Sequence, residues 1–229
     1  MVIAIWGRDG SGKSTLSDTL GVSLSKRGIC IVIDTDLTQP TLPVRCPGVP
    51  LKEKKSLGHA LAGAVVTDIR PYLCQHMEHM GLFYAGLLPD DDYLSFELGL
   101  GAENAARNFV ARCAEQADVV ILDVSGQRTD PFLPAALDAD KLILPVVPDV
   151  QGLCWYLSVK PLLERMGVME RILPVAFMVR AEQDIAGVEK AGGLQFRAQL
   201  PWVQDTGNGK YTRALKPLLH MFEGGDANG

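Results

Sequence analysis

The sequence predicts an α/β fold, a three-layer sandwich in which helices cover both faces of a mostly parallel central sheet. Three observations support this prediction. Short apolar runs alternate along the chain with segments of helical periodicity. Carboxylates follow several of these runs, as expected where ligands gather at the C-terminal edge of a parallel sheet. A glycine-rich turn joins the first apolar run to the first helical segment.

The strand predictions rest on runs that are apolar throughout, which is typical of strands buried on both faces. The first run is closed by Gly7, and the second by the sequence Asp34-Thr35-Asp36. The predicted strands are residues 2–6, 29–33, 82–87, 119–123, 141–147 and 172–179.

The helix predictions rest on apolar residues three or four apart. In the first helical segment Leu16, Leu20 and Leu24 share one face, and Gly28 is a plausible stop. A proline-rich stretch, residues 39–50, is predicted to be a loop, and residues 89–92 a turn. The predicted helices are residues 14–26, 57–64, 102–116, 131–137, 153–166 and 211–222, the last interrupted or kinked at Pro217.

Length and composition indicate one globular domain. The 229 residues show no internal repeat and no convincing linker, so residues 1–229 are predicted to form a single domain. The net charge of −5 argues against sequence-independent nucleic-acid binding. Five widely spaced cysteines without a CxxC pair indicate reduced thiols, and the apolar start is too short for a signal peptide. A cytoplasmic protein without a membrane-spanning segment is therefore predicted.

The glycine-rich turn satisfies the spacing of a phosphate-binding loop, Gly7-x-x-x-x-Gly12-Lys13-Ser14. Such glycines let successive backbone N–H groups cradle phosphates at the positive end of the following helix. Lys13 is expected to reach the β- and γ-phosphates, and the Ser14 hydroxyl to bind Mg²⁺. The residues expected to surround the nucleotide phosphates are Gly7, Asp9, Gly10, Ser11, Gly12, Lys13, Ser14 and Thr15.

Carboxylates at the ends of two predicted strands suit a magnesium site. Asp123 ends the run at residues 119–123, where a carboxylate can hold a water on Mg²⁺. Asp34 and Asp36 follow the second strand and could orient the metal shell and the attacking water. Gly126 could present its N–H to a γ-phosphate. The competing interpretations are turn chemistry for Asp34 and Asp36, and helix capping or a turn for Asp123.

The order of these motifs resembles the MinD/ParA family of deviant-Walker P-loop ATPases, which also includes the nitrogenase iron protein. The resemblance runs through nearly the whole chain, with the motifs in the same order. The matching stretches are the phosphate loop, residues 31–36, 56–63, 82–89, 117–123 with Gly126, 139–149 and 200–202.

This resemblance implies ATP hydrolysis with Mg²⁺, in which Lys13, Asp34 and Asp36 act in catalysis and Asp36 orients the water. The resemblance further implies that the metal is bound by Ser14, Asp36 and Asp123. It places two residues beside the base, Arg180 and Pro201. It also implies an ATP-sandwiched homodimer that recruits or positions a protein partner, in roles such as division, partition or pilus placement. The segment from Leu215 to Phe222 only slightly resembles a membrane-targeting helix and does not indicate membrane association.

The loop departs from the family at two positions, because Arg8 and Asp9 stand where the family has lysine and glycine. Arg8 keeps the charge that in the family crosses to the partner's phosphates and could act in catalysis there. Asp9 weakens the expectation of a dimer and resembles the acceptor-facing aspartate of thymidylate kinases. The family's base-reading asparagine before Arg180 is absent. A small-molecule kinase and a nucleotide-binding scaffold without hydrolysis therefore stay open as alternatives.

Overall fold

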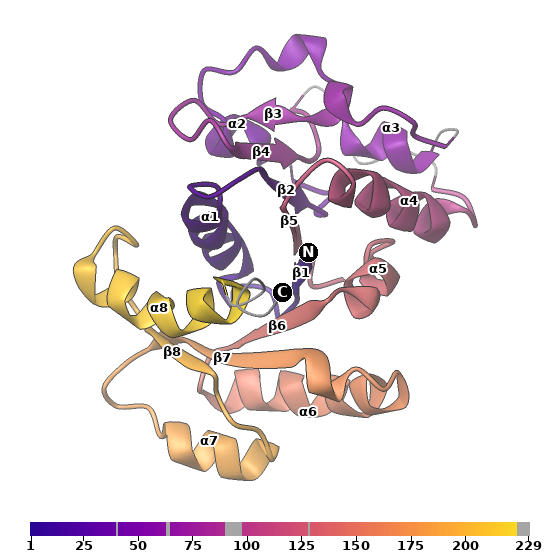
Figure 1. Cartoon of the computed structure of the whole chain (residues 1–229). Coiled ribbons are helices and arrows are strands. Elements are labelled where there is room, and N and C mark those ends of the chain that lie inside the picture. Colours follow the sequence, from indigo (N-terminus) through magenta and orange to yellow (C-terminus); the bar gives the residue numbers. More distant parts are fainter. Residues whose placement is uncertain (40, 63–64, 90–97, 128, 224–229) are drawn as a thin grey trace, which may run out of the picture. The chain divides into compact units, whose positions relative to one another are not determined.

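The computed structural model describes residues 1–39, 41–62, 65–89, 98–127 and 129–223 (Figure 1). The chain divides into two compact units. The first contains residues 1–5 and 14–140, and the second contains residues 6–13 and 141–229. Helix α1, Lys13–Leu24, begins where the chain passes from the second unit into the first.

The first unit is built on a sheet whose strands lie in the order β3-β4-β2-β5-β1. Neighbouring strands of this sheet pair in parallel, except that β3 runs antiparallel to β4. The register of β2 and β5 sets Asp34 beside Asp123 at the C-terminal ends of the two strands. The strands are β1 (Val2–Ile5), β2 (Cys30–Asp34), β3 (Cys74–Gln75), β4 (Leu82–Ala85) and β5 (Val119–Asp123).

Helices cover both faces of this sheet, which makes the first unit three-layered. In Figure 1, α1 lies on one face, and α3, α4 and α5 lie on the other. The second group forms a continuous layer because α4 contacts both α3 and α5. Besides α1, the helices are α2 (Leu42–Arg45), α3 (Leu57–Ala62), α4 (Ala102–Ala114) and α5 (Leu133–Asp138), with short 3-10 turns at Leu51–Glu53 and Arg70–Tyr72.

The second unit contains the parallel strands β6, β7 and β8 in that order, with a bulge in β7 between Ala176 and Val179. Helix α8 lies on one face of these strands, and α6 and α7 lie on the other (Figure 1). The bounds are β6 (Lys141–Val146), β7 (Ile172–Val179), β8 (Ala198–Pro201), α6 (Val150–Arg165), α7 (Ile185–Gly192) and α8 (Gly209–Glu223), with a 3-10 turn at Met169–Arg171.

The apolar runs found in the sequence form the cores of both units. β2 is buried along its whole length, and β5 and β6 are buried after their first residue. Burying these runs removes apolar surface from water on both faces of the sheets, which is the main favourable contribution to folding. The predicted α/β fold class with a mostly parallel sheet and flanking helices is therefore confirmed.

The structure corrects several element predictions. The prediction of a loop at residues 39–50 is wrong in part, because α2 forms one helical turn there. Pro43 suits this turn because proline fits the first turn of a helix. Strand β8 and helices α7 and α2 were not predicted, and α8 continues through Pro217. The last two residues of the predicted helix 57–64 and most of the predicted turn 89–92 lie outside the described residues.

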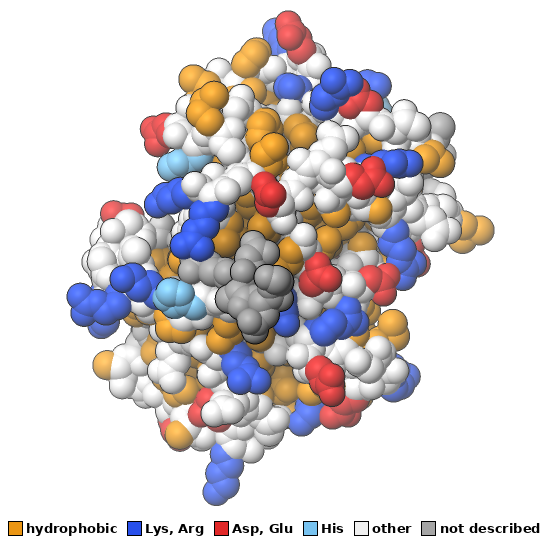
Figure 2. Space-filling model, viewed as in Figure 1, with side chains coloured by type: hydrophobic (Ala, Val, Ile, Leu, Met, Phe, Trp, Pro, Cys, Tyr) orange, Lys and Arg blue, Asp and Glu red, His pale blue; other side chains and the backbone are white. Residues whose placement is uncertain are grey.

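The surface carries charges of both signs (Figure 2). On the face shown in Figure 2, basic and acidic side chains lie intermixed. Within the part of the chain that the structure describes, no helix is both long and apolar enough to cross a bilayer. All five cysteines are free thiols, four of them buried and Cys154 exposed.

Candidate functional site

The phosphate-binding loop has the backbone that its glycines predict. Gly10 and Gly12 adopt φ of +73° and +84°, a left-handed region that side chains with a Cβ rarely enter. A Cβ on Gly12 would also lie 2.1 Å from Cε1 of Phe177 in β7, whereas one on Gly10 would meet nothing within 4 Å. Glycine is thus required at position 12 for two reasons: its φ angle is positive, and the Phe177 ring leaves no room for a Cβ.

Lys13 folds back over this loop from the first position of α1. Its Nζ donates to the carbonyl of Arg8 at 3.2 Å and lies 3.3 Å from Oδ1 of Asp9. The Lys13 side chain is nearly buried, while that of Asp9 is 81% exposed. The buried hydroxyl of Ser11 makes no hydrogen bond to any described residue, and its amide donates to the Arg8 carbonyl. The loop therefore offers a cation and an unsatisfied hydroxyl.

Arg8 is held within its own chain. One of its terminal nitrogens, Nη1, donates to Oε1 of Gln151 in α6 at 2.8 Å. Its Nε is buried and makes no hydrogen bond among the described residues. For Arg8 to reach the phosphates of a second copy, as the resemblance implies, it would first have to leave Gln151.

The residues expected beside the base also belong to the second unit. Arg180 follows β7, and its guanidinium lies 5.4 Å from the ring centroid of Trp202. Pro201 is the last residue of β8, and the Trp202 side chain after it is 53% exposed. An exposed indole beside an arginine is a surface on which a planar base can stack.

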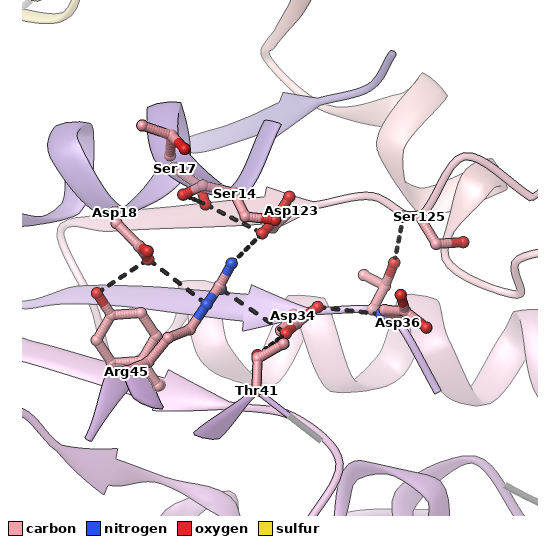
Figure 3. Close-up of polar contacts among 12 residues, drawn as sticks. Ser14, Ser17, Asp18, Asp34, Asp36, Thr41, Arg45, Asp123 and Ser125 are labelled. Carbon is pink, nitrogen blue, oxygen red and sulfur yellow. Dashed lines mark hydrogen bonds and ion pairs between the residues drawn. The ribbon is translucent and has the colours of Figure 1, made fainter. Parts of the chain in front are cut away.

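The acids predicted to bind magnesium separate into two groups in the first unit. Asp34 and Asp123 lie side by side and share a buried cation, the guanidinium of Arg45 from α2 (Figure 3). Arg45 Nη2 donates to Oδ2 of Asp123, which also accepts a hydrogen bond from the Ser17 hydroxyl at 3.1 Å. Asp18 of α1 completes the cluster, with its Oδ1 3.6 Å from Nε of Arg45.

Burial controls the protonation of this cluster. Desolvation raises the pKa of Asp34 to about 6, although the Arg45 charge and the Thr41 hydroxyl oppose the shift. Burial likewise raises the pKa of Asp18 against the attraction of Arg45. The pKa of Arg45 itself is raised, because the attraction of Asp123, Asp34 and Asp18 exceeds the penalty of its burial. The guanidinium therefore stays charged, with three carboxyl groups around it.

Asp36 lies outside this cluster. Its carboxylate accepts the Thr38 amide at 2.8 Å and the Thr38 hydroxyl, which is the turn chemistry that the sequence left as an alternative. Its own amide donates to Oδ1 of Asp34 at 3.1 Å. Figure 3 shows Asp36 on the side of Asp34 that faces Ser125 and away from Arg45.

A buried acid outside the cluster, Asp130, ties the loops after β2 and β5 together. Asp130 accepts the Thr35 hydroxyl and the Ser125 amide, the latter at 3.0 Å, and burial raises its pKa. Its other oxygen accepts the Phe132 amide at 2.8 Å, just before α5. Gly126 follows Ser125 and is thereby anchored next to the end of β5. Thr35 and Asp130 thus fix the loop in which the sequence placed a γ-phosphate contact.

The donor set fits magnesium. Carboxylate and hydroxyl oxygens are the ligands that this ion prefers, and Asp34, Asp123 and Ser14 supply them at or beside the ends of neighbouring elements. No group of three or more His, Cys, Asp or Glu within the described ranges is arranged as a complete metal cage. Mg²⁺ needs no such cage, because it is usually held by one or two protein groups, water and substrate phosphates.

Sequence reasoning missed several polar residues that form this site. Arg45, Asp18 and Asp130 belong to no motif, and each meets its partners only through the fold. One signal was present, since Arg45 is a single charge in the otherwise uncharged stretch Leu42 to Pro50. Such a charge is buried only when it is paired.

The fold is shared with known nucleotide-binding proteins. No protein-family model matches the chain, and a search of curated proteins found no match. Among solved structures, it is similar to the septum site-determining protein MinD of Pyrococcus horikoshii complexed with Mg-ADP, at 18% identity and a TM-score of 0.77, covering 97% of this chain and 96% of that one. It is also similar to a plasmid partition protein of Borrelia burgdorferi bound to AMPPNP, at 16% and 0.78, covering 97% of each chain.

A third similar structure is a biosynthetic enzyme. Cobyrinic acid a,c-diamide synthase of Mycobacterium smegmatis, with ADP and magnesium bound, matches at 18% identity and a TM-score of 0.73, covering 98% of this chain and 97% of that one. The chain therefore has the P-loop ATPase fold. More particularly, it has the fold of the MinD and ParA-like ATPases, which confirms the resemblance found in the sequence.

Proposed function

We propose that this chain binds and hydrolyses ATP with Mg²⁺ and acts as a nucleotide-dependent switch that positions other proteins. The observation that carries the proposal is the loop from Gly7 to Lys13. Its positive φ angles, buried Ser11 hydroxyl and inward lysine match what a phosphate-binding loop requires. The Mg-ADP, AMPPNP and ADP-magnesium complexes of the similar structures support the choice of ligands.

Residues of this chain would bind the phosphates, the base, the metal and the attacking water as follows. Lys13 would leave Asp9 and hold the phosphates, with Ser11 and the amides of Gly10 and Gly12 beside it. Thr15 and Gly126 would complete the phosphate contacts, and Arg180 with Pro201 would flank the base. Ser14, Asp123 and Asp36 would hold the metal and its waters, and Asp36 with Asp34 would orient the attacking water. Bound Mg²⁺ supplies the charge that neutralises the phosphate oxygens.

The switch requires a second copy of the chain and a protein partner. We infer an ATP-dependent homodimer in the reducing cytoplasm, in which Arg8 exchanges Gln151 for a phosphate of the other copy. Hydrolysis would be slow until a partner stimulates it. Both units would act as a single nucleotide-binding domain spanning residues 1–229.

Size-exclusion chromatography combined with phosphate-release measurements tests this function. The Asp36→Ala variant with ATP and Mg²⁺ is expected to elute as a dimer and to release less phosphate than the unchanged chain. Lys13→Ala is the matched control that should stay monomeric under the same conditions. A monomer in every sample would contradict the switch. If the unchanged chain released phosphate no faster than the Lys13→Ala variant, hydrolysis by this chain would be contradicted.

One observation favours a second candidate, transfer of the phosphoryl group to a small molecule. The Asp9 carboxylate is exposed at the phosphate loop, where it could accept a hydrogen bond from an acceptor hydroxyl. The similar cobyrinic acid a,c-diamide synthase shows that this fold also serves biosynthesis. ADP release measured across nucleoside monophosphates decides: turnover that depends on an acceptor would favour the kinase, and acceptor-independent release would favour the switch.

A further inference from the structure

Arg45 occupies the centre of the acidic cluster as its built-in cation. Its side chain is only 5% exposed, and its guanidinium also lies 5.7 Å from the ring centroid of Tyr84. Nη2 donates to Asp123, Nε lies 3.6 Å from Asp18, and Nη1 lies 3.9 Å from Asp34 (Figure 3). Arg45 thus contacts the two acids that end β2 and β5, Asp34 and Asp123.

The pairing with Arg45 leaves negative charge in the cluster uncompensated and leaves one N–H donor of Arg45 without a hydrogen bond. Among the described residues, Asp18, Asp34 and Asp123 place three carboxylates around one guanidinium. Nη1 of Arg45 is buried and makes no hydrogen bond, which is unfavourable inside a protein. One guanidinium therefore neutralises the cluster incompletely, and a cation of higher charge and smaller size would interact with it more strongly.

One of these carboxylates, Asp123, is assigned to magnesium by the proposed function, and Asp34 is assigned there to the attacking water beside the metal. Oδ2 of Asp123 already accepts from both Arg45 and Ser17. A hydrated Mg²⁺ approaches a carboxylate through the same lone pairs, and two cations a few ångströms apart in a buried site repel each other. Arg45 and a metal held at Asp123 would therefore compete for this carboxylate.

We propose that Arg45 is a resident counter-ion that Mg²⁺ with nucleotide must displace from Asp34 and Asp123. This inference rests on the proposed function, because it requires the metal to be held at Asp123 and the attacking water to lie beside Asp34. Arg45 ends α2, so its displacement would shift the short segment from Leu42 to Cys46. Metal loading would then be reported directly by a change in this segment, which also carries the exposed side chain of Val44.

Titration with Mn²⁺, followed by electron paramagnetic resonance in the presence of ATP, tests the competition. The Arg45→Gln variant keeps much of the side chain's length but loses its charge, so it is expected to bind Mn²⁺ at least about tenfold more tightly than the unchanged chain. Arg107→Gln is the matched control, because Arg107 pairs with Asp138 on the surface of the same unit. Its Mn²⁺ affinity should not change.

The outcomes separate this inference from the proposed function. Unchanged or weaker Mn²⁺ binding by Arg45→Gln, with normal binding by the unchanged chain, would overturn the role of Arg45 alone. No binding of Mn²⁺ with ATP by any of the three proteins would overturn the proposed function and the inference with it.

Alkylation of Cys46 tests the displacement in the unchanged chain and does not depend on the Arg45→Gln variant folding. The Cys46 thiol is buried next to Arg45 and lies 3.8 Å from the Cys74 carbonyl. Iodoacetamide labelling, read by mass spectrometry of peptides, should be several-fold faster at Cys46 with ATP and Mg²⁺ than with ATP and EDTA. Buried Cys113 is the internal control and should not change. Equal or slower labelling of Cys46 with Mg²⁺ would overturn the displacement.

Discussion

The phosphate loop and the acidic cluster are built in different ways. The loop is a run of eight residues, 7–14, in which backbone φ angles and one lysine supply the chemistry. The cluster joins side chains from α1, β2, α2 and β5, and its properties depend on how their charges balance. A site made of backbone can be recognised from spacing within one segment, whereas a site made of distant side chains becomes visible only in the fold.

The largest expected effect tests whether the loop depends on its backbone. Gly12→Ala forces a Cβ into a left-handed residue and against Phe177, so it should lower the free energy of unfolding by about 2–5 kcal/mol. Gly10→Ala is the matched control with open space around it and should cost only about 1–2 kcal/mol. Urea unfolding measures both. Equal losses would show that the contact with Phe177 contributes nothing.

The next effect concerns the loop's single lysine. Lys13→Ala should weaken ATP binding about 100-fold, which corresponds to about 2.7 kcal/mol, because it removes the cation that faces the phosphates. Lys26→Ala removes an exposed lysine just beyond the other end of α1 and should leave the affinity unchanged. Calorimetric titration with ATP compares the two. A loss of affinity in both variants would indicate a general charge effect and not a binding loop.

The acidic cluster predicts a dependence of stability on pH. A raised pKa means that the folded chain binds the proton of Asp34 more tightly than the unfolded chain, whose carboxyl has the ordinary value of 3.8. The resulting stabilisation is full below pH 3.8 and is lost as the pH rises through about 6. Between pH 7.5 and 5 in EDTA, this group should therefore add about 1 kcal/mol.

The Asp34→Asn variant isolates this contribution. Its free energy of unfolding should gain less than that of the unchanged chain over the same pH interval, since asparagine does not titrate. Urea unfolding at both pH values gives the difference. The same gain in both proteins would mean that Asp34 does not titrate in this range.

The smallest effect concerns Asp9, one of the two residues at which the loop departs from the pattern of the family that it resembles. Asp9 pairs with Lys13 from an exposed position, and exposed pairs contribute little. Asp9→Asn should free Lys13 and reduce repulsion of the phosphates, and it should tighten ATP binding by roughly two- to fivefold. Glu170→Gln removes an exposed acid from the 3-10 turn before β7 and should have no effect. Weaker binding by Asp9→Asn would contradict competition between Asp9 and the phosphates.

Most of the fold could be predicted from the sequence, because apolar runs in β2, β5 and β6 are unambiguous when both faces are buried. Short elements were missed for physical reasons. The single turn of α2 is too short to show periodicity, and β8 alternates buried and exposed residues over only four positions.

The candidate site was predictable only in part. Gly12 and Lys13 follow from a local pattern, and Asp34 and Asp123 follow from strand ends. The partnership of Arg45 with Asp123 could not be predicted, because the two residues are 78 positions apart and no motif links them. The sequence did not decide whether Asp36 joins the cluster, because its carboxylate can either accept hydrogen bonds from Thr38 in a turn or lie beside the metal.

Calorimetric titration of the unchanged chain with ATP, once with Mg²⁺ and once with EDTA, is the most direct measurement of whether this chain is a magnesium-dependent ATP-binding protein. The phosphate loop and the acids at the ends of β2 and β5 predict saturable binding of one nucleotide per chain, with clearly higher affinity when Mg²⁺ is present. The absence of saturable binding in both titrations would contradict this assignment, and equal affinity in both would contradict the metal site.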